Sequence, residues 1–322
     1  MTPTVTFVLC IENNAIRDQA LLLCESIRLF TGRYRDAPIL AVSPRPGLGI
    51  DAATRRRLEA LDAQYVEEPL NHLCPEYGSA NRVFSAAWAE THTEAEWIVV
   101  LDSDTIFLGE PELPADADVA VRPIDSKGSA TEGVGDPFDE YWSKLAAMQG
   151  VSLDCLPFVR TTDGCHSVRA SYNGGLIVAR RDRGILRAWA DLFARSVQAG
   201  LRPWKDTGHS VFASTGFVGA AASEYWGSNQ AAVALAIWSL TTRVRPYPDS
   251  YNVPLHLLLN RPDLVAAPRT SPPVHVHYHW VFAAEYQERA LATLTALGVP
   301  ADQIDWLAAR LPLPLPVEQV VA

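Results

Sequence analysis

The stretch WIVVLDSDTIFL, residues 97–108, joins two apolar runs through a pair of acidic residues. The first run predicts a strand that is covered on both faces. An ionised carboxylate beside such a strand is costly unless its charge is compensated. In strand-like geometry residues two apart point the same way, so we expect Asp102 and Asp104 to converge on one point. A divalent cation with phosphate oxygens would compensate them; an acidic loop is the alternative, because aspartate is common where strands end.

Short apolar segments alternate with amphipathic ones through the first hundred residues. Strands are expected at residues 5–11, 38–42, 64–66 and 97–101, with helices from about residue 17, after Asp51 and from Ser79. This alternation predicts an α/β fold, a mostly parallel sheet flanked by helices in a single compact domain. Ligands bind at the carboxyl ends of such strands, where Glu12, Asn13 and the Asp102–Asp104 segment lie.

The second half of the chain holds two further features. Residues 125–170 have a poor pattern and predict a long binding loop that selects an acceptor. Residues 274–279, VHVHYH, predict by alternation a strand with His275, His277 and His279 on one face. Three histidines on one face suggest a metal, phosphate or carboxylate nearby. We choose His277 as the metal ligand, with the other two supporting it or binding phosphate.

Composition restricts the class of protein. The chain has 322 residues, is 48% hydrophobic and 20% charged, and carries a formal net charge of −10. The acidic balance argues against general nucleic-acid binding. No apolar segment is long enough to span a bilayer, and the first residues lack the basic stretch of a signal peptide. Five scattered cysteines without zinc-site spacing predict buried free thiols and a cytoplasmic location.

Five ordered motifs resemble the nucleotide-sugar glycosyltransferases of the GT-A fold, with family 8 as the nearest pattern. They are the first apolar strand with its polar turn, the Asp-Ser-Asp segment at 102–104, Tyr-Asn-Gly-Gly at 172–175, Gly-Ser-Asn-Gln at 227–230 and Val-His-Tyr at 276–278. The resemblance covers residues 5–280. It implies transfer of a sugar from a nucleoside diphosphate, with UDP favoured, to a hydroxyl of a carbohydrate or other acceptor. A homodimer is one expected form of assembly.

The resemblance also implies roles for single residues. The metal, Mn²⁺ or Mg²⁺, would be held on the donor diphosphate by Asp102, Asp104 and His277. The donor would contact residues on both sides of that site: Ile11, Glu12, Asn13, Arg82, Asp102, Ser103 and Gly174. A solvated helix face is the alternative for Arg82, and a plain turn is the alternative for Asn173 and Gly174.

The catalytic set implied by the resemblance is Asn173, Asn229 and Gln230. Family 8 usually has Asp-Gln where this chain has Asn229-Gln230, so the position lacks a carboxylate and the stereochemical outcome is undecided. Glu224 is an available carboxylate nearby, or a surface residue. Trp226 and Trp280 would stack on a sugar or base, or belong to the core.

We expect a donor half over residues 1–114, an acceptor half over 115–298 and a C-terminal helix with a proline-rich tail over 299–322. Three other functions use similar features. A nucleotidyltransferase would show a Gly-rich basic turn after the first strand, where this chain has Glu12-Asn13-Asn14. A phosphohydrolase would place a nucleophilic aspartate there. A non-catalytic binding protein of the same fold would not need the intact acidic and histidine residues.

Overall fold

The computed structural model describes residues 3–314 and is built on a seven-stranded sheet of order β12-β6-β9-β4-β1-β2-β3. Its strands are β1 (Val5–Cys10), β2 (Ile39–Ser43), β3 (Ala63–Glu67), β4 (Trp97–Leu101), β6 (Val119–Pro123), β9 (Tyr172–Arg180) and β12 (Val244–Pro246). β9 runs antiparallel to both of its neighbours, and the other pairs are parallel. The predicted mixed, mostly parallel sheet is confirmed.

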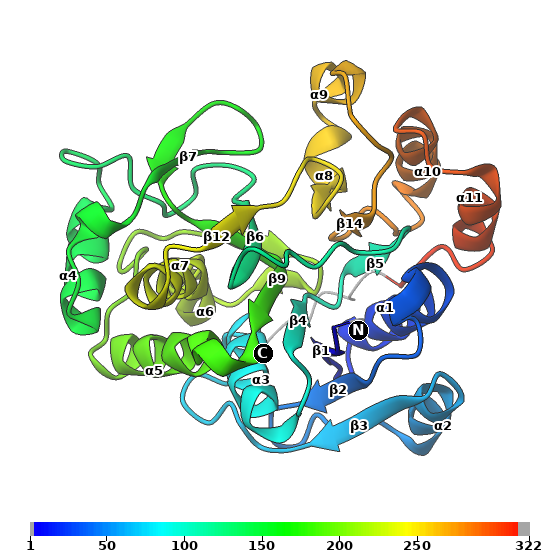
Figure 1. Ribbon diagram of the computed structural model, residues 1–322, viewed down its shortest axis with the longest axis horizontal. Helices are drawn as coiled ribbons and strands as arrows, with labels where there is room; N and C mark the ends of the chain where they lie inside the picture. Colours follow the sequence, from blue (N-terminus) through cyan, green and yellow to red (C-terminus); the bar gives the residue numbers. More distant parts are fainter. Residues whose placement is uncertain (1–2, 315–322) are drawn as a thin grey trace.

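Helices cover both faces of this sheet (Figure 1). α1 (Ile16–Phe30) and α2 (Ala52–Ala60) pack on the face that carries Phe7. The opposite face, which carries Val8, is covered by α3 (Ala80–His92), α4 (Asp139–Gln149), α5 (Ile185–Gln198) and α7 (Ser228–Leu240). Successive side chains of a strand point to opposite faces, so a strand covered on both sides is apolar throughout. As expected, Asp51 caps α2 by accepting a hydrogen bond of 2.7 Å from the Thr54 backbone N–H.

A second, smaller sheet of order β13-β14-β5 stands beside α1. It consists of β5 (Thr105–Phe107), β14 (His275–His277) and β13 (Val253–Pro254), and it shares a core with α8 (Leu255–Leu258), α10 (Gln287–Ala296) and α11 (Ala301–Ala308). The chain leaves the large sheet at Leu101 and enters the small one at Thr105. The two aspartates therefore lie where the two sheets meet.

The remaining helices and strands are α6 (Ala220–Glu224), α9 (Pro262–Ala266), the hairpin of β7 (Phe158–Arg160) with β8 (Ser167–Arg169), and the hairpin of β10 (Val211–Ala213) with β11 (Gly216–Val218). The prediction of an irregular loop over residues 125–170 is wrong, because α4 and the β7–β8 hairpin lie within it. Glycine and polar residues between these short elements hide their periodicity. Of the predicted proline-rich tail, residues 315–322 lie outside the described residues.

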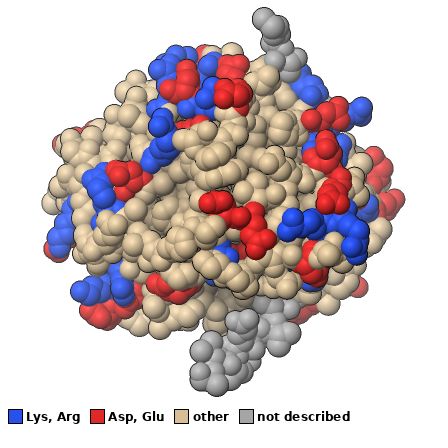
Figure 2. All heavy atoms as spheres, turned by 90° about the horizontal axis from the view of Figure 1, so that it is seen from below, with Lys and Arg blue, Asp and Glu red and all other residues tan. Residues whose placement is uncertain are grey.

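Charge is mixed on the face seen in Figure 2, where basic side chains stand among acidic ones. This differs from the continuous basic surface that supplies affinity for nucleic acid. Among residues 3–314, none of the helices combines the length and the apolar character that crossing a membrane requires. All five cysteines are free; Cys165 is exposed and Cys155 half-buried, so the prediction of buried thiols holds for Cys10, Cys24 and Cys74.

Candidate active site

The Asp102–Asp104 segment is a tight turn, so the expected strand-like geometry is wrong. The chain has only these three residues in which to pass from one sheet to the other. Two hydroxyls hold the turn: Thr105 Oγ1 donates to the Asp102 carbonyl at 2.7 Å, and Ser103 Oγ donates to the Cys10 carbonyl at 2.5 Å. Ser103 thereby ties the end of β4 to the end of β1.

Both carboxylates nevertheless approach one imidazole. His277 Nε2, at the end of β14, lies 3.4 Å from Asp104 Oδ1 and 3.8 Å from Asp102 Oδ2. These separations are those of an ion pair rather than a hydrogen bond, and both ring nitrogens of His277 lack a hydrogen-bond partner although the side chain is 3% exposed. A buried polar atom without a partner is rare and asks for a ligand or an ion.

The three histidines do not share a strand face as predicted. β14 ends at His277, and His279 follows in a left-handed conformation with φ of 53°. That turn brings His279 Nδ1 to 3.4 Å from Asp104 Oδ2. His275 is fully buried and packs edge-on against Phe107, with ring centroids 4.7 Å apart. Both ring nitrogens of His275 also lack hydrogen-bond partners, but His275 belongs to neither group at metal-ligand spacing among the described residues. His275 therefore packs in the core, and His279 joins His277.

Asp104, His277 and His279 form a group with the chemistry and spacing of a metal site, which we call the metal cluster. One ligand atom from each lies within 4.8 Å of the other two. Ligands around one ion at about 2.1 Å stand roughly 3 Å apart, so small adjustments suffice. Imidazole nitrogen with carboxylate oxygen suits transition metals such as Mn²⁺ better than Mg²⁺, which prefers oxygen alone.

Protonation in the site favours metal binding. Burial works to raise the pKa of Asp104, but the neighbouring His277 and His279 imidazoles outweigh it and hold that pKa well below its usual range. Burial lowers the pKa of His279 well below the usual histidine range. A carboxylate and a neutral imidazole are the protonation states in which these groups ligate a metal.

Two glycines of β9 make room for the site. A Cβ atom on Gly175 would stand 2.6 Å from His277 Nδ1, and a Cβ atom on Gly174 would collide with the Arg82 guanidinium. Both glycines lie within β9 rather than in a turn before it, so the turn alternative for Gly174 is wrong. The absence of side chains at these two positions lets an imidazole and a guanidinium approach the sheet closely.

Arg82 is not on a solvated helix face. It is 7% exposed on α3, and its guanidinium forms an ion pair with Asp102. This pair compensates one of the two aspartates within the protein and leaves the other to the histidines. The Arg82 Nε atom is buried without a hydrogen-bond partner.

Asn173 is paired with a residue that the sequence analysis did not single out. Asn173 Nδ2 donates a 2.8 Å hydrogen bond to Asp125 Oδ2, and Asn173 Oδ1 accepts one of 2.8 Å from the Gly175 N–H. Burial raises the pKa of Asp125 to about 6. Asp125 also groups with His256 and His279 at metal-ligand spacing. Asp125 follows β6 at the same sheet edge, which was the available signal, whereas nothing distinguished the lone His256.

Glu12 lies at the neighbouring strand end and is fully buried. Its carboxylate accepts hydrogen bonds from Arg45 (Nε at 2.8 Å), Asn81 at 3.1 Å and Asn14 at 3.1 Å. We call these four residues the Glu12 cluster. Both carboxylate oxygens of Glu12 therefore already accept hydrogen bonds within the protein.

The other predicted site residues differ in their burial and in their hydrogen-bond partners. Ile11 is buried, while Asn13 is exposed. Asn229 is 2% exposed, and its Oδ1 accepts a hydrogen bond of 3.1 Å from the Tyr77 hydroxyl, which ties α7 to the start of α3. Gln230 beside it is half-buried. Of the alternatives for Glu224, a free carboxylate does not hold, since Arg202 Nη1 donates to it at 2.7 Å.

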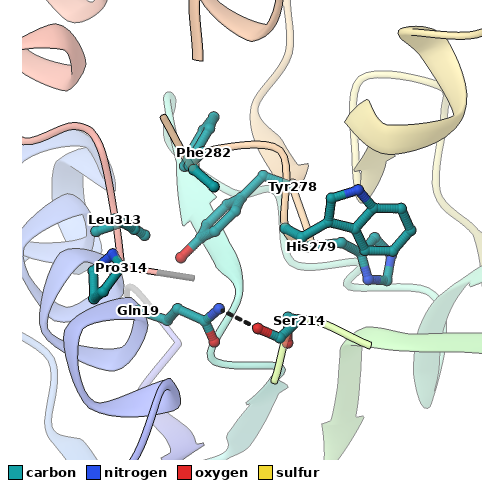
Figure 3. A pocket seen from close by; sticks show the side chains of 9 residues that line it. Gln19, Ser214, Tyr278, His279, Phe282, Leu313 and Pro314 are labelled. Carbon is teal, nitrogen blue, oxygen red and sulfur yellow. Dashed lines mark hydrogen bonds between the residues drawn. The ribbon is translucent and has the colours of Figure 1, made fainter. Parts of the chain in front are cut away.

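The loop of the β10–β11 hairpin reaches the metal cluster. The Gln19 side chain of α1 donates a 3.3 Å hydrogen bond to the Ser214 carbonyl, and Figure 3 shows these two residues facing each other with Tyr278 and His279 alongside. The same residues, with Leu313 and Pro314, line a small cavity. The Ser214 hydroxyl also contributes to the low pKa of Asp104.

Comparison with known proteins identifies the family. The Rhodobacterales glycosyltransferase domain matches residues 7–206, more than half of the chain. The chain belongs to this glycosyltransferase family. The match includes the two aspartates and the glycine pair, while His277 and His279 lie beyond it. No curated protein matches the chain.

Several solved structures have a similar fold. An active-site mutant of LgtC is 11% identical with a TM-score of 0.50, over 95% of this chain and 96% of that one. The bifunctional glycosyltransferase WbbM is 12% identical with a TM-score of 0.48 over 97% of this chain, which spans 52% of WbbM. Mouse xyloside xylosyltransferase 1 is 11% identical with a TM-score of 0.43, over 86% of this chain and 97% of that one.

These findings confirm the GT-A fold and the glycosyltransferase assignment. The protein is therefore a glycosyltransferase, and the family match supports none of the three alternative functions. The narrower likeness to family 8 stays a prediction.

Proposed function

We propose that the protein transfers a sugar from a nucleoside-diphosphate sugar, with UDP favoured, to an acceptor hydroxyl in a reaction that depends on Mn²⁺ or Mg²⁺. The observation that carries the proposal is the convergence of Asp104, His277 and His279, with buried ring nitrogens that lack partners. Residues 1–114 would form the donor half and residues 115–298 the acceptor half. The helix after residue 298 would pack against the core of the small sheet.

The metal would be held by Asp104 and His277, with Asp102 beside them as the sequence suggests and His279 as an additional ligand. When bound, the ion supplies positive charge to the diphosphate as it departs. The oxygen of the acceptor hydroxyl forms the new bond to the anomeric carbon, the bond from that carbon to the diphosphate breaks, and the hydroxyl proton is released.

The remaining residues would position the donor. The Arg82 guanidinium lies against Gly174 and pairs with Asp102, and its buried Nε atom has no partner in the protein, so Nε–H could donate a hydrogen bond to the diphosphate. Asn173 and Asp125 form a hydrogen-bonded pair that can accept hydrogen bonds from sugar hydroxyls. Gln230 would contact the sugar, whereas Asn229 is engaged by Tyr77 and would act by placing Gln230.

The nucleobase would lie at the end of β1. Glu12 is enclosed by its own cluster, so we assign it to holding the chain rather than to touching the base. Contact with the base would come from the neighbouring backbone at Ile11 and from the exposed Asn13. The Ser103 hydroxyl donates a hydrogen bond to the Cys10 carbonyl and would thereby set the distance between this end of β1 and the metal cluster.

The test is a thermal-shift and product panel of UDP-, GDP-, ADP- and TDP-sugars, each with Mn²⁺ and with EDTA. A ligand that binds the folded state raises the melting temperature by mass action. We expect one nucleotide series to stabilise the protein only with Mn²⁺ and to release free nucleoside diphosphate. Release of pyrophosphate, or stabilisation that is equal in EDTA, would contradict the proposal.

A further inference from the structure

The β10–β11 hairpin next to the metal cluster carries aromatic side chains and no charged ones. From Thr207 to Ser223 the chain carries no Lys, Arg, Asp or Glu. This stretch contains the β10–β11 hairpin, in which Phe212 pairs directly with Phe217 across the strands. Phe217 is 69% exposed and Phe212 40% exposed. Neither ring fills a core, and large apolar side chains left exposed beside a site are typical of a binding surface.

The aromatic rings form a line that starts at the metal cluster. His279 lies 5.7 Å from Trp280, Trp280 lies 5.5 Å from Phe212, and Phe212 lies 5.1 Å from Phe217, measured between ring centroids. We call Trp280, Phe212 and Phe217 the aromatic line. Its inner end touches a residue of the metal cluster, and its outer end is in solvent.

The hairpin is anchored at its tip. A hairpin of two three-residue strands is only marginally stable by itself. Here the Ser214 carbonyl accepts the hydrogen bond from Gln19 of α1, and the Ser214 hydroxyl lies beside Asp104. These contacts hold the tip of the hairpin beside the metal cluster, and Figure 3 shows the hydrogen bond between Gln19 and Ser214 next to His279.

We propose that the aromatic line binds the acceptor as a neutral saccharide, with a pyranose ring stacked on the exposed Phe217 and flanked by Phe212, whose ring stands edge-on to it. This inference rests on the proposed function and names the substrate class of the same site. An aromatic face packs against the C–H face of a sugar ring, and a rigid ring loses little conformational entropy on binding. The lack of charged residues makes the hairpin unsuited to the donor diphosphate. Because the line is continuous from Phe217 to His279, a saccharide bound along it would extend toward the metal cluster.

The first experiment measures binding of methyl glycosides of galactose, glucose, mannose and N-acetylglucosamine by saturation-transfer NMR. Phe217→Ala removes the exposed ring, and Phe217→Tyr retains it. Phe158→Ala is the matched control, because Phe158 is a 50% exposed phenylalanine on the β7–β8 hairpin that packs against Arg169. Melting temperatures confirm that each variant is folded.

We expect at least one glycoside to bind the wild-type protein, with saturation of its ring protons. Phe217→Ala should weaken this binding by about tenfold, the effect of losing one stacked ring, while Phe217→Tyr and Phe158→Ala bind as the wild type does. Equal binding by Phe217→Ala, or no glycoside bound by the wild type, would overturn the proposal. Light scattering that shows a dimer lost in Phe217→Ala would assign the hairpin to a second copy and would overturn it too.

Failure of the proposed function has a different signature. Wild-type protein is incubated with Mn²⁺ and each UDP-sugar in the absence of acceptor, and release of UDP to water is measured. Release of UDP without any glycoside binding contradicts only the acceptor assignment. Glycoside binding that depends on Phe217, without release from any nucleotide sugar, contradicts only the donor assignment.

Discussion

Two buried polar clusters lie at the carboxyl ends of neighbouring strands, and they differ in how fully their polar atoms are paired. At the end of β1, Glu12 accepts hydrogen bonds from Arg45, Asn81 and Asn14. At the end of β4, Asp104 faces His277 and His279 at 3.4 Å, and buried nitrogens of both rings lack hydrogen-bond partners. Because an unpaired buried polar atom costs stability, a paired cluster supports the fold, whereas the unpaired cluster is arranged for a ligand.

The largest expected effect is on catalysis by the metal cluster. Asp104→Ala should lower sugar transfer by at least about 10³-fold, because it removes a ligand of the ion that stabilises the leaving diphosphate. In EDTA its melting temperature should stay close to that of the wild type, while the stabilisation by Mn²⁺ with a nucleoside diphosphate disappears. Unchanged metal-dependent binding in calorimetry would refute the metal assignment.

A change in the Glu12 cluster should lower the stability of the fold rather than metal binding. Glu12→Gln leaves Arg45 without its buried counter-charge and should lower the free energy of unfolding by about 3 kcal/mol. This loss should appear equally in EDTA and in Mn²⁺, as measured by urea denaturation. Glu59→Gln, a change at an exposed helical site, is the control. If Glu12→Gln is as stable as the wild type but binds donor more weakly, Glu12 contacts the donor and the comparison fails.

Gly175 tests the space around His277. Gly175→Ala places a methyl group against the Asn252 side chain and 2.6 Å from His277 Nδ1, so the Asn252 amide, the His277 imidazole or both must move. We expect Mn²⁺ affinity to fall by about 10- to 100-fold, the range for misoriented metal ligands. Gly78→Ala is the control, since a Cβ atom there meets nothing within 4 Å. Equal Mn²⁺ affinity for the Gly175 variant and wild type would contradict the claim that the missing side chain at Gly175 is needed to hold His277 as a ligand.

The smallest effect concerns the pH dependence of stability at Asp125. Its pKa is raised from 3.8 to about 6 by burial, so the folded state holds the proton more tightly than the unfolded state. Stability is therefore lost as pH rises from about 4 to about 6, and the loss then stays constant. In EDTA, Asp125→Asn should be more stable than wild type at pH 8 by roughly 1 kcal/mol, and equal at pH 4.

The control for this effect is Asp36→Asn, since the Asp36 side chain is 88% exposed. Its stability relative to wild type should not change between pH 4 and pH 8. A pH-independent difference for Asp125→Asn would mean that the Asp125 carboxyl ionises normally.

The sequence predicted the large sheet well because its strands are buried on both faces and therefore apolar throughout. It also placed Glu12 and the Asp102–Asp104 segment at one edge, since the carboxyl ends of parallel strands meet there. His277 was predicted from the histidine alternation and the family resemblance, because its strand belongs to the small sheet. It failed where a local turn overrides the pattern. The left-handed residue His279 breaks the alternation that placed three histidines on one face.

Pairing between distant segments was the second obstacle. The pairing of Glu12 with Arg45 was not predicted, because Arg45 carries no sequence signal of its own. Asp125 was hidden in a stretch interpreted as a loop, and only the structure brings it to Asn173. Such contacts depend on where the chain returns to the sheet, which short-range periodicity does not encode.

The most direct test of the unpaired cluster is a calorimetric titration of UDP, GDP, ADP and TDP into the wild-type protein, with Mn²⁺ and with EDTA. We expect one diphosphate to bind with Mn²⁺ and its affinity to fall by at least about tenfold in EDTA. Equal affinity in EDTA, or no binding of any diphosphate with Mn²⁺, would contradict the claim that Asp104, His277 and His279 hold the metal that receives the donor.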